Sequence, residues 1–229
     1  MPSERFFCDT QFDSKIHLNG EELHHLKKVM RVVVGEEIEL INGKSELAKA
    51  TVISYGQNEA VLDVHTIEKR PQEKIRILIQ AIPRQNHLDY IIEKGTELGA
   101  TTFTLFPGEL SEKKELSETQ LRRLRAISIA ALKQCGRLDL PHIEFRPPIS
   151  RWSPFPIKAF FGDTDPQAKR ITDTERSLSA IAFFIGPEKG FSKNEITILT
   201  EKLHVRPVRL HDNILRVETA ASVALSLFY

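Results

Sequence analysis

The chain has 229 residues, of which 41% are hydrophobic and 28% are charged, and its formal net charge is +1. This composition is typical of a soluble globular protein, and no apolar run approaches the roughly 20 residues that a membrane span needs. The N-terminal segment lacks the apolar core of a signal peptide, and two cysteines, Cys8 and Cys135, are too few for a disulfide framework. We therefore expect a cytoplasmic protein that is not bound to a membrane.

Short runs with the alternation of β-strands dominate the first 70 residues. A helix is predicted at residues 20–32, because Asn19 suits the N-cap position and Glu22 follows three residues later. Strands are predicted at residues 36–41, 48–55 and 60–65, and the Asn42-Gly43 pair is typical of a hairpin turn, here with a looser connection than two residues. The pattern predicts a small β-barrel with one helix, a class that often binds RNA but also serves other functions.

A polar stretch around Pro71 separates this segment from one in which strands and helices alternate. Strands are predicted at residues 75–82, 101–106, 157–162, 181–186 and 205–210. Helices are predicted at residues 86–99, from Ser117 to about Cys135, after Ser192 and within 211–229, with capping boxes formed by Ser117 and Gln120 and by Ser192 and Glu195. The alternation indicates an α/β fold with a parallel sheet, so we place one domain at residues 1–70 and another at 74–229.

The segment 183–196 reads as a buried strand, a tight Gly-Pro-Glu-Lys-Gly turn and the start of a helix. Corners of this kind bind ligands, because backbone amides and a helix N-terminus converge at the ends of parallel strands. Motifs of other common sites are absent from the sequence. There is no G-x-G-x-x-G of a dinucleotide site, Ile38 stands where a P-loop needs glycine, and there is neither an H-E-x-x-H zinc motif nor a G-x-S-x-G serine motif. The residues alone predict a ligand site near 186–190 and 211–219, with no metal.

The segment 113–137 is basic, with seven lysines and arginines against Glu115 and Glu118. A local excess of this size suits a phosphate backbone. The alternative is the solvated face of an amphipathic helix, and the composition leaves both interpretations open.

Two segments, FIGPEKGFSKNEI (184–196) and LHDNILRVETAASVAL (210–225), resemble the paired signature of the SPOUT methyltransferases. Among these, the chain is most similar to the ribosomal RNA small subunit methyltransferase E family. Further elements of that family follow in the same order over nearly the whole chain: RFF at 5–7 and the segments 24–43, 91–106 and 129–143.

The resemblance implies a trefoil-knotted C-terminal domain, a PUA-like N-terminal β-barrel for RNA binding and a homodimer. The implied activity is S-adenosylmethionine-dependent methylation of N3 of a uridine in small-subunit (16S) ribosomal RNA, within the assembled 30S subunit. Two alternatives stay open: a SPOUT enzyme that methylates a ribose 2′-hydroxyl of tRNA or rRNA, and a catalytically inactive RNA-binding relative.

The resemblance also implies site residues. The cofactor-binding residues would be Phe161, Gly162, Ile185, Gly186, Pro187, Glu188, Gly190, Leu210, Asn213, Ile214 and Leu215. Arg216 would hold the uracil or its phosphate, and Glu218 would accept a proton or brace Arg216. RNA would contact Arg5, Arg31, Arg84, Lys94, Arg122 and Arg137.

The chain departs from the family pattern at three places. Lys189 replaces the second glycine of the turn, His211-Asp212-Asn213 replaces a G-x-R element, and Leu110 replaces an arginine after the second strand of the α/β segment. These departures bear on cofactor binding and on RNA contact, and they are the reason why an inactive relative stays among the alternatives.

Overall fold

The structure is a computed structural model that describes residues 5–228, so the ends of the predicted barrel (1–4) and of the C-terminal helix (229) lie outside the described residues. The chain forms two compact units. The first contains the residues up to Gln72 together with Ile129–Leu140, and the second contains Glu73–Ser128 and the residues from Pro141 onward. The segment Ile129–Leu140 clusters with the first unit, whereas the predicted boundaries placed it in the second.

The first unit is built on a five-stranded sheet in the order β1-β3-β4-β5-β2. Its strands are β1 (Arg5–Phe7), β2 (Lys15–Asn19), β3 (Glu37–Ile41), β4 (Glu46–Tyr55) and β5 (Glu59–Lys69). Strand β1 runs parallel to β3, and the other pairs are antiparallel. The three predicted strands are confirmed, and the connection between β3 and β4 is longer than two residues, as expected. Strands β1 and β2 were not predicted.

The helix of the first unit is shorter than predicted. Helix α1 (Gly20–His24) continues into a π-helical turn, η1 (His25–Val29), and ends before the predicted limit of residue 32. Asn19 is the N-cap, but its side chain makes no capping hydrogen bond. Glu22 instead accepts hydrogen bonds from the backbone N–H of Phe7 at 3.2 Å and from Lys133 Nζ at 2.8 Å. The Glu22 carboxylate therefore binds strand β1 and Lys133 and does not form the capping box that the sequence predicted.

The second unit is built on a six-stranded sheet in which every neighbouring pair is parallel, in the order β11-β9-β10-β6-β7-β8. Its strands are β6 (Ile75–Ala81), β7 (Thr102–Phe106), β8 (His142–Phe145), β9 (Lys158–Gly162), β10 (Ala180–Ile185) and β11 (Arg206–Val208). Its helical segments are α2 (Gln85–Glu97), α3 (Glu118–Cys135, shared with the first unit), η2 (Ile149–Arg151), α4 (Asp173–Arg176), α5 (Lys193–Thr197), η3 (Ile198–Lys202) and α6 (Val217–Ser226). The predicted parallel α/β fold is confirmed, and β8 and α4 were not predicted.

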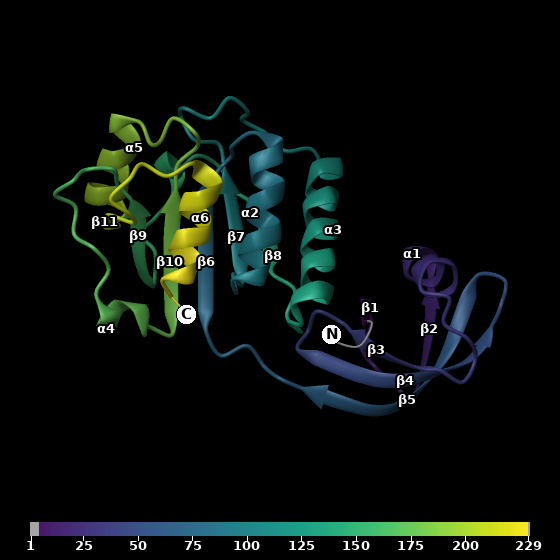
Figure 1. The fold of residues 1–229 in the computed structure, drawn as a ribbon. Coiled ribbons are helices and arrows are strands. Elements are labelled where there is room, and N and C mark those ends of the chain that lie inside the picture. The colour runs from purple at the N-terminus through teal and green to yellow at the C-terminus, as the bar shows by residue number, and fades with distance from the viewer. Residues whose placement is uncertain (1–4, 229) are drawn as a thin grey trace. The chain divides into compact units, whose positions relative to one another are not determined.

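Both faces of this sheet are covered, which explains why its strands are continuous apolar runs. On β10, Phe183 belongs to a core with α2 and α6, whereas its neighbour Phe184 belongs to a second core with η3 and Trp152. Figure 1 shows α2 and α6 lying along the sheet, and these two helices contact each other. The capping boxes predicted at Ser117 and Ser192 are both present. No described helix combines the length and the apolar character needed to cross a bilayer.

Candidate functional site: a cavity at the strand ends

A cavity of about 340 Å³ lies where β9, β10 and β11 end. Its wall is formed by the ends of these strands, the turn after β10, the loop after β11 and the first turns of α6. Parallel sheets bind ligands at this edge, because the loops that follow neighbouring strands meet there. All eleven residues that the resemblance assigned to the cofactor line the cavity: Phe161, Gly162, Ile185, Gly186, Pro187, Glu188, Gly190, Leu210, Asn213, Ile214 and Leu215.

The turn after β10 is close-packed on itself. A Cβ atom on Gly186 would lie 2.9 Å from the carbonyl carbon of Gly190, which is closer than real Cβ contacts allow. Gly190 has φ +73°, a left-handed conformation that favours glycine, and its N–H donates to the carbonyl of Pro187 at 2.8 Å. Glycine is thus favoured at the two positions for different reasons: position 186 has no room for a side chain, and position 190 has a left-handed backbone conformation.

The chemical character of the wall is mixed. Phe161 and Ile185 are buried at the back of the wall and Leu210 is half-buried, while Glu188 and Lys189 carry opposite charges in the turn. Ile214 is 83% exposed, so the loop after β11 presents an apolar side chain at the cavity. Apolar walls with a few placed polar groups are typical of small-molecule sites.

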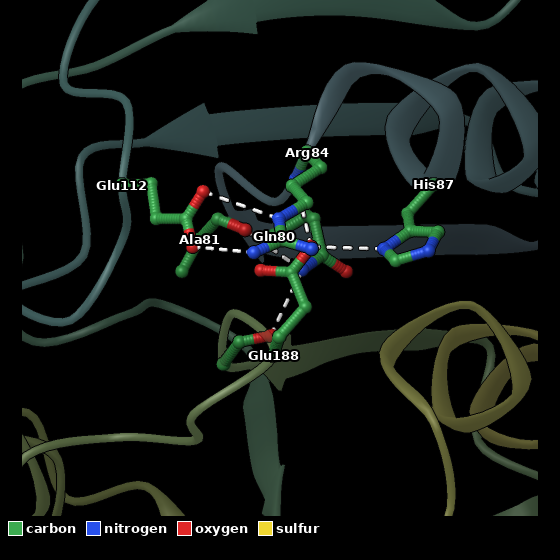
Figure 2. Close-up of polar contacts among 7 residues, drawn as sticks. Gln80, Ala81, Arg84, His87, Glu112 and Glu188 are labelled. Carbon is green, nitrogen blue, oxygen red and sulfur yellow. Dashed lines mark hydrogen bonds and ion pairs between the residues drawn. The ribbon is translucent and has the colours of Figure 1, made fainter.

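Gln80, near the end of β6, ties the neighbouring loops to the sheet (Figure 2). Its side chain is fully buried, and Nε2 donates to the carbonyls of Ala81 at 2.8 Å and Gly186 at 3.1 Å. Within the part of the chain that the structure describes, its Oε1 atom is buried and has no partner. The sequence analysis did not single out Gln80, although a glutamine inside an otherwise apolar strand was a usable signal.

A polar network surrounds Glu188 at the cavity wall (Figure 2). Its Oε1 accepts hydrogen bonds from the backbone N–H of Arg84 and from Nδ1 of His87, both at 2.8 Å. The Arg84 guanidinium makes two hydrogen bonds to Glu112, at 3.1 and 2.7 Å. Burial by itself would raise the pKa of Glu188, but hydrogen bonds from the Arg84 backbone, its own backbone and His87 outweigh burial and hold this pKa below its usual value.

The segment His211-Asp212-Asn213, which departs from the family pattern, is held in place by contacts with two arginines. The Arg209 guanidinium donates to the carbonyls of His211, Asp212 and Pro166, at 3.1 to 3.2 Å. Asp212 also pairs with Arg170 at 2.6 Å, and this pairing lowers the pKa of Asp212. Arg209 and Asp212 thus fix this loop, in which the family pattern has a glycine and an arginine.

The two proposed catalytic residues lie beside the cavity but are not part of its wall. Arg216 is exposed and is the N-cap of α6, directly after the cavity-lining residue Leu215. Glu218, in the first turn of α6, is half-buried, and its Oε2 atom is buried without a hydrogen-bond partner among the described residues. No hydrogen bond joins Arg216 to Glu218 within residues 5–228, so the bracing role considered for Glu218 has no contact behind it.

The residues expected to contact RNA have different surroundings. Arg31 and Arg122 are exposed, whereas the Arg5 side chain is only 12% exposed and pairs with Glu39 at 2.8 Å. Arg84 and Lys94 have exposed or half-exposed side chains that pair with neighbouring carboxylates. Burial lowers the pKa of the half-buried Arg137. These six residues therefore divide into four that reach solvent and two, Arg5 and Arg137, that are largely packed inside the first unit.

The basic segment is largely engaged within the protein. Lys113 donates to Gln120, Lys114 to the carbonyl of Gly108, and Arg123 to Asp89. Lys133 pairs with Glu22 at 2.8 Å. These contacts favour the interpretation as a solvated helix face with local partners.

The protein thus combines a parallel α/β unit with a small β unit. The α/β unit carries a cavity that loops build at the strand ends, so the protein belongs to the class of α/β proteins with a ligand site at that edge of the sheet. A family model described as an RNA methyltransferase domain matches residues 69–229, and one described as an RNA methyltransferase PUA domain matches residues 18–64. The chain therefore belongs to this family of RNA methyltransferases, and its N-terminal unit contains a PUA-type domain.

Relatives with known names extend the comparison. The chain is 28% identical over 226 residues to the ribosomal RNA small subunit methyltransferase E of Bacillus subtilis, covering 91% of this chain and 87% of the relative. It is 28% identical over 220 residues to the protein of the same name from Rickettsia conorii, covering 93% and 89%. A crystal structure of ribosomal RNA small subunit methyltransferase E from Neisseria gonorrhoeae bound to S-adenosyl methionine has the same fold, with a TM-score of 0.87, 24% identity and coverage of 97% and 95%.

Proposed function

We propose that the protein transfers a methyl group from S-adenosylmethionine to N3 of a uridine in small-subunit ribosomal RNA. RNA methylation follows from the family, and the relatives' names support small-subunit ribosomal RNA as the substrate. The choice of uridine N3 rests on the resemblance of the two signature segments alone. The observation that carries the proposal is the cavity, because it gathers every residue of both signature segments that the resemblance assigned to the cofactor.

The residues of the cavity fit this cofactor. A volume of about 340 Å³ suits a nucleoside-sized ligand, and the exposed Ile214 and half-buried Leu210 offer apolar surface for an adenine ring. Gly162 has no side chain, and a Cβ there would lie 3.3 Å from Leu210 Cδ1, so the missing side chain leaves room at the wall. Glu188 supplies a negative charge for a cationic group. When bound, S-adenosylmethionine supplies an electrophilic methyl group.

The reaction requires that uridine N3 lose its proton, since the protonated nitrogen is a poor nucleophile. Glu218, in the first turn of α6 beside the cavity, is our candidate for accepting this proton. Its buried Oε2 has no partner among the described residues, and the side chain would have to turn toward the base to act. Arg216 is exposed next to the cavity loop and would stabilise negative charge that develops on the uracil ring. Positioning of the base against the methyl group would provide the remaining acceleration.

RNA contact is assigned to the exposed cations. Arg31 and Arg122 would bind phosphates directly, and Arg84 and Lys94 would exchange a carboxylate partner for a phosphate. We assign structural roles to Arg5 and Arg137, because the Arg5 side chain pairs with Glu39 and is only 12% exposed, and Arg137 is half-buried. The assembled 30S subunit as substrate, the homodimer and the trefoil knot remain predictions from the resemblance, and the cytoplasmic location remains a prediction from the composition.

Incubation of the protein with labelled S-adenosylmethionine and small ribosomal subunits, followed by mass spectrometry of the nucleosides, tests the function. We expect 3-methyluridine, with assembled subunits a better substrate than naked RNA. A ribose-methylated nucleoside would instead support the 2′-hydroxyl alternative, and cofactor binding without any product would support the inactive relative.

Arg216→Ala tests the assignment of Arg216. We expect turnover to fall by at least about 100-fold, the scale of one lost electrostatic contact to a transition state, while cofactor affinity stays nearly unchanged. Full turnover in this variant would remove Arg216 from the mechanism. Lys193→Ala, an exposed cation of α5 outside the cavity wall, is the matched control.

A further inference from the structure

His87 holds one oxygen of the only glutamate in the cavity wall among the described residues. Its Nδ1 atom lies 2.8 Å from Oε1 of Glu188, and the side chains of the two residues are 23% and 29% exposed. Because an ionised carboxylate only accepts hydrogen bonds, Nδ1 carries the proton. The Arg84 backbone N–H reaches the same oxygen. Within the described part of the chain, no other residue donates a hydrogen bond to the second oxygen, and the backbone of Glu188 itself also donates to the carboxylate.

The donors on Glu188 are themselves fixed. Arg84 is the N-cap of α2, so the start of the helix fixes the position of its backbone N–H. His87 lies in the first turn of the same helix, whose N-terminus favours a negative charge nearby. Gln80 holds the carbonyl of Gly186 and so anchors the turn from the side of β6. Figure 2 shows Arg84 and His87 lying beside Glu188.

A carboxylate restrained in this way is ionised at neutral pH, because its hydrogen bonds lower its pKa despite burial. It is therefore a fixed negative charge in a wall that combines apolar residues with other charged groups: Asp163, Lys189, Arg209 and Asp212. A charge in such surroundings interacts more strongly with a ligand cation than it would in water.

We propose that His87 is a positioning residue that aims the Glu188 carboxylate at the sulfonium cation of S-adenosylmethionine. This inference rests on the proposed function, since it takes that cofactor as the ligand. The cation distinguishes S-adenosylmethionine from its product, S-adenosylhomocysteine, whose sulfur is a neutral thioether. His87 thereby contributes to preference for the substrate form over the product form.

Calorimetry with both ligands on the full-length protein tests the proposal. His87→Ala should weaken binding of S-adenosylmethionine about tenfold, the scale of one hydrogen bond to a charged group, and binding of S-adenosylhomocysteine by less than about twofold. His87→Asn should restore most of the preference, because its side-chain N–H can take the place of Nδ1. Glu188→Gln, which keeps the size of the side chain and removes its charge, should lose the preference as His87→Ala does.

His17→Ala is the matched control. His17 Nδ1 also pairs with a glutamate, Glu59, at 2.9 Å, but it belongs to the other compact unit. We expect both affinities to stay unchanged in this variant. Equal losses for the two ligands in His87→Ala would mean that the histidine only shapes the wall, and unchanged affinities would mean that it does not act on the site; either result overturns the proposal. Wild-type protein that binds neither ligand would instead overturn the proposed function itself.

Discussion

Gly186 is the position of the cavity wall where a side chain has the least room. The three atoms that a Cβ at this position would meet first belong to the backbone of Gly190 and Phe191, at 2.9 to 3.0 Å. Backbone atoms cannot rotate away as a side chain can. A substitution must therefore move the whole turn that carries Glu188. At Gly190, by contrast, a Cβ would meet nothing within 4 Å, and only the φ of +73° opposes a side chain.

Gly186→Ala should therefore weaken binding of S-adenosylmethionine more than Gly190→Ala does. Overpacking costs about 1–3 kcal/mol, which corresponds to about 5- to 150-fold in affinity. For Gly190→Ala we expect a loss of about 1 kcal/mol in the free energy of unfolding, from backbone strain, and a change in affinity below about threefold. Calorimetry and urea unfolding measure the two effects, and an equal loss of affinity in both variants would contradict the distinction between the glycines.

Part of the site could not be predicted from the sequence, because some of its residues lie far apart in the chain. The two signature segments were recognisable because each is contiguous. His87 and Gln80 contact the turn after β10 across 101 and 106 positions, and their spacing carries no periodic signal. Only the parallel pairing of β6 with β10 brings them to the same edge of the sheet. The cavity wall was thus predictable from motifs, whereas the groups that hold it required the fold.

At the scale of elements, two of the three predicted capping patterns form. The Ser192 and Glu195 pair forms its capping box, with Glu195 buried at the start of α5. The Asn19 and Glu22 pair does not, because Glu22 is taken by Phe7 and Lys133. Strand β1 has three residues, too few for an alternation to be read from the sequence.

The loop after β11 depends on Arg209, which joins it to the loop after β9. Its guanidinium reaches one carbonyl there, that of Pro166, and two in its own loop, and its side chain is 24% exposed. Arg209→Ala should loosen both loops, which carry cavity-lining residues. We expect affinity for S-adenosylmethionine to fall about tenfold, on the scale of one hydrogen bond to a charged group, with little change in the melting temperature, because the loops lie outside the cores.

Arg170→Ala is the control for this loop. Arg170 pairs with the same Asp212, but both side chains are at least 60% exposed, so the pair is worth at most about 1 kcal/mol. Its loss should change cofactor affinity less than about twofold. If both arginine variants bind the cofactor as the wild type does, the loop is held by other contacts and the role of Arg209 is wrong.

At the scale of the whole molecule, α3 belongs to both compact units. Its N-terminal part, up to Ser128, clusters with the parallel sheet, and the segment from Ile129 to Leu140 clusters with the first unit. Leu124 is fully buried in the core that contains Phe103, and Leu132 is fully buried in a separate cluster with Phe7 and Ile41. The sequence showed a single capped helix, and no local pattern revealed that its two parts serve different cores.

Alanine substitutions at these two leucines should therefore destabilise different parts of the protein. Each removes a fully buried leucine, which costs about 2–5 kcal/mol in the free energy of unfolding. In native-state hydrogen exchange, Leu132→Ala should lower the protection of amides in β1 and β3, the strands that carry Phe7 and Ile41. Leu124→Ala should lower protection in β7, which carries Phe103.

The two variants serve as controls for each other, because the residue type, the burial and the helix are the same. Cofactor affinity adds a second measurement, since the cavity is built entirely by residues of the second unit. Leu132→Ala should keep wild-type affinity at temperatures where both units are folded, because its cluster contains no residue of the cavity wall. Identical exchange patterns in the two variants would show that the units unfold as one cooperative body, and the division of α3 between two cores would then have no thermodynamic meaning.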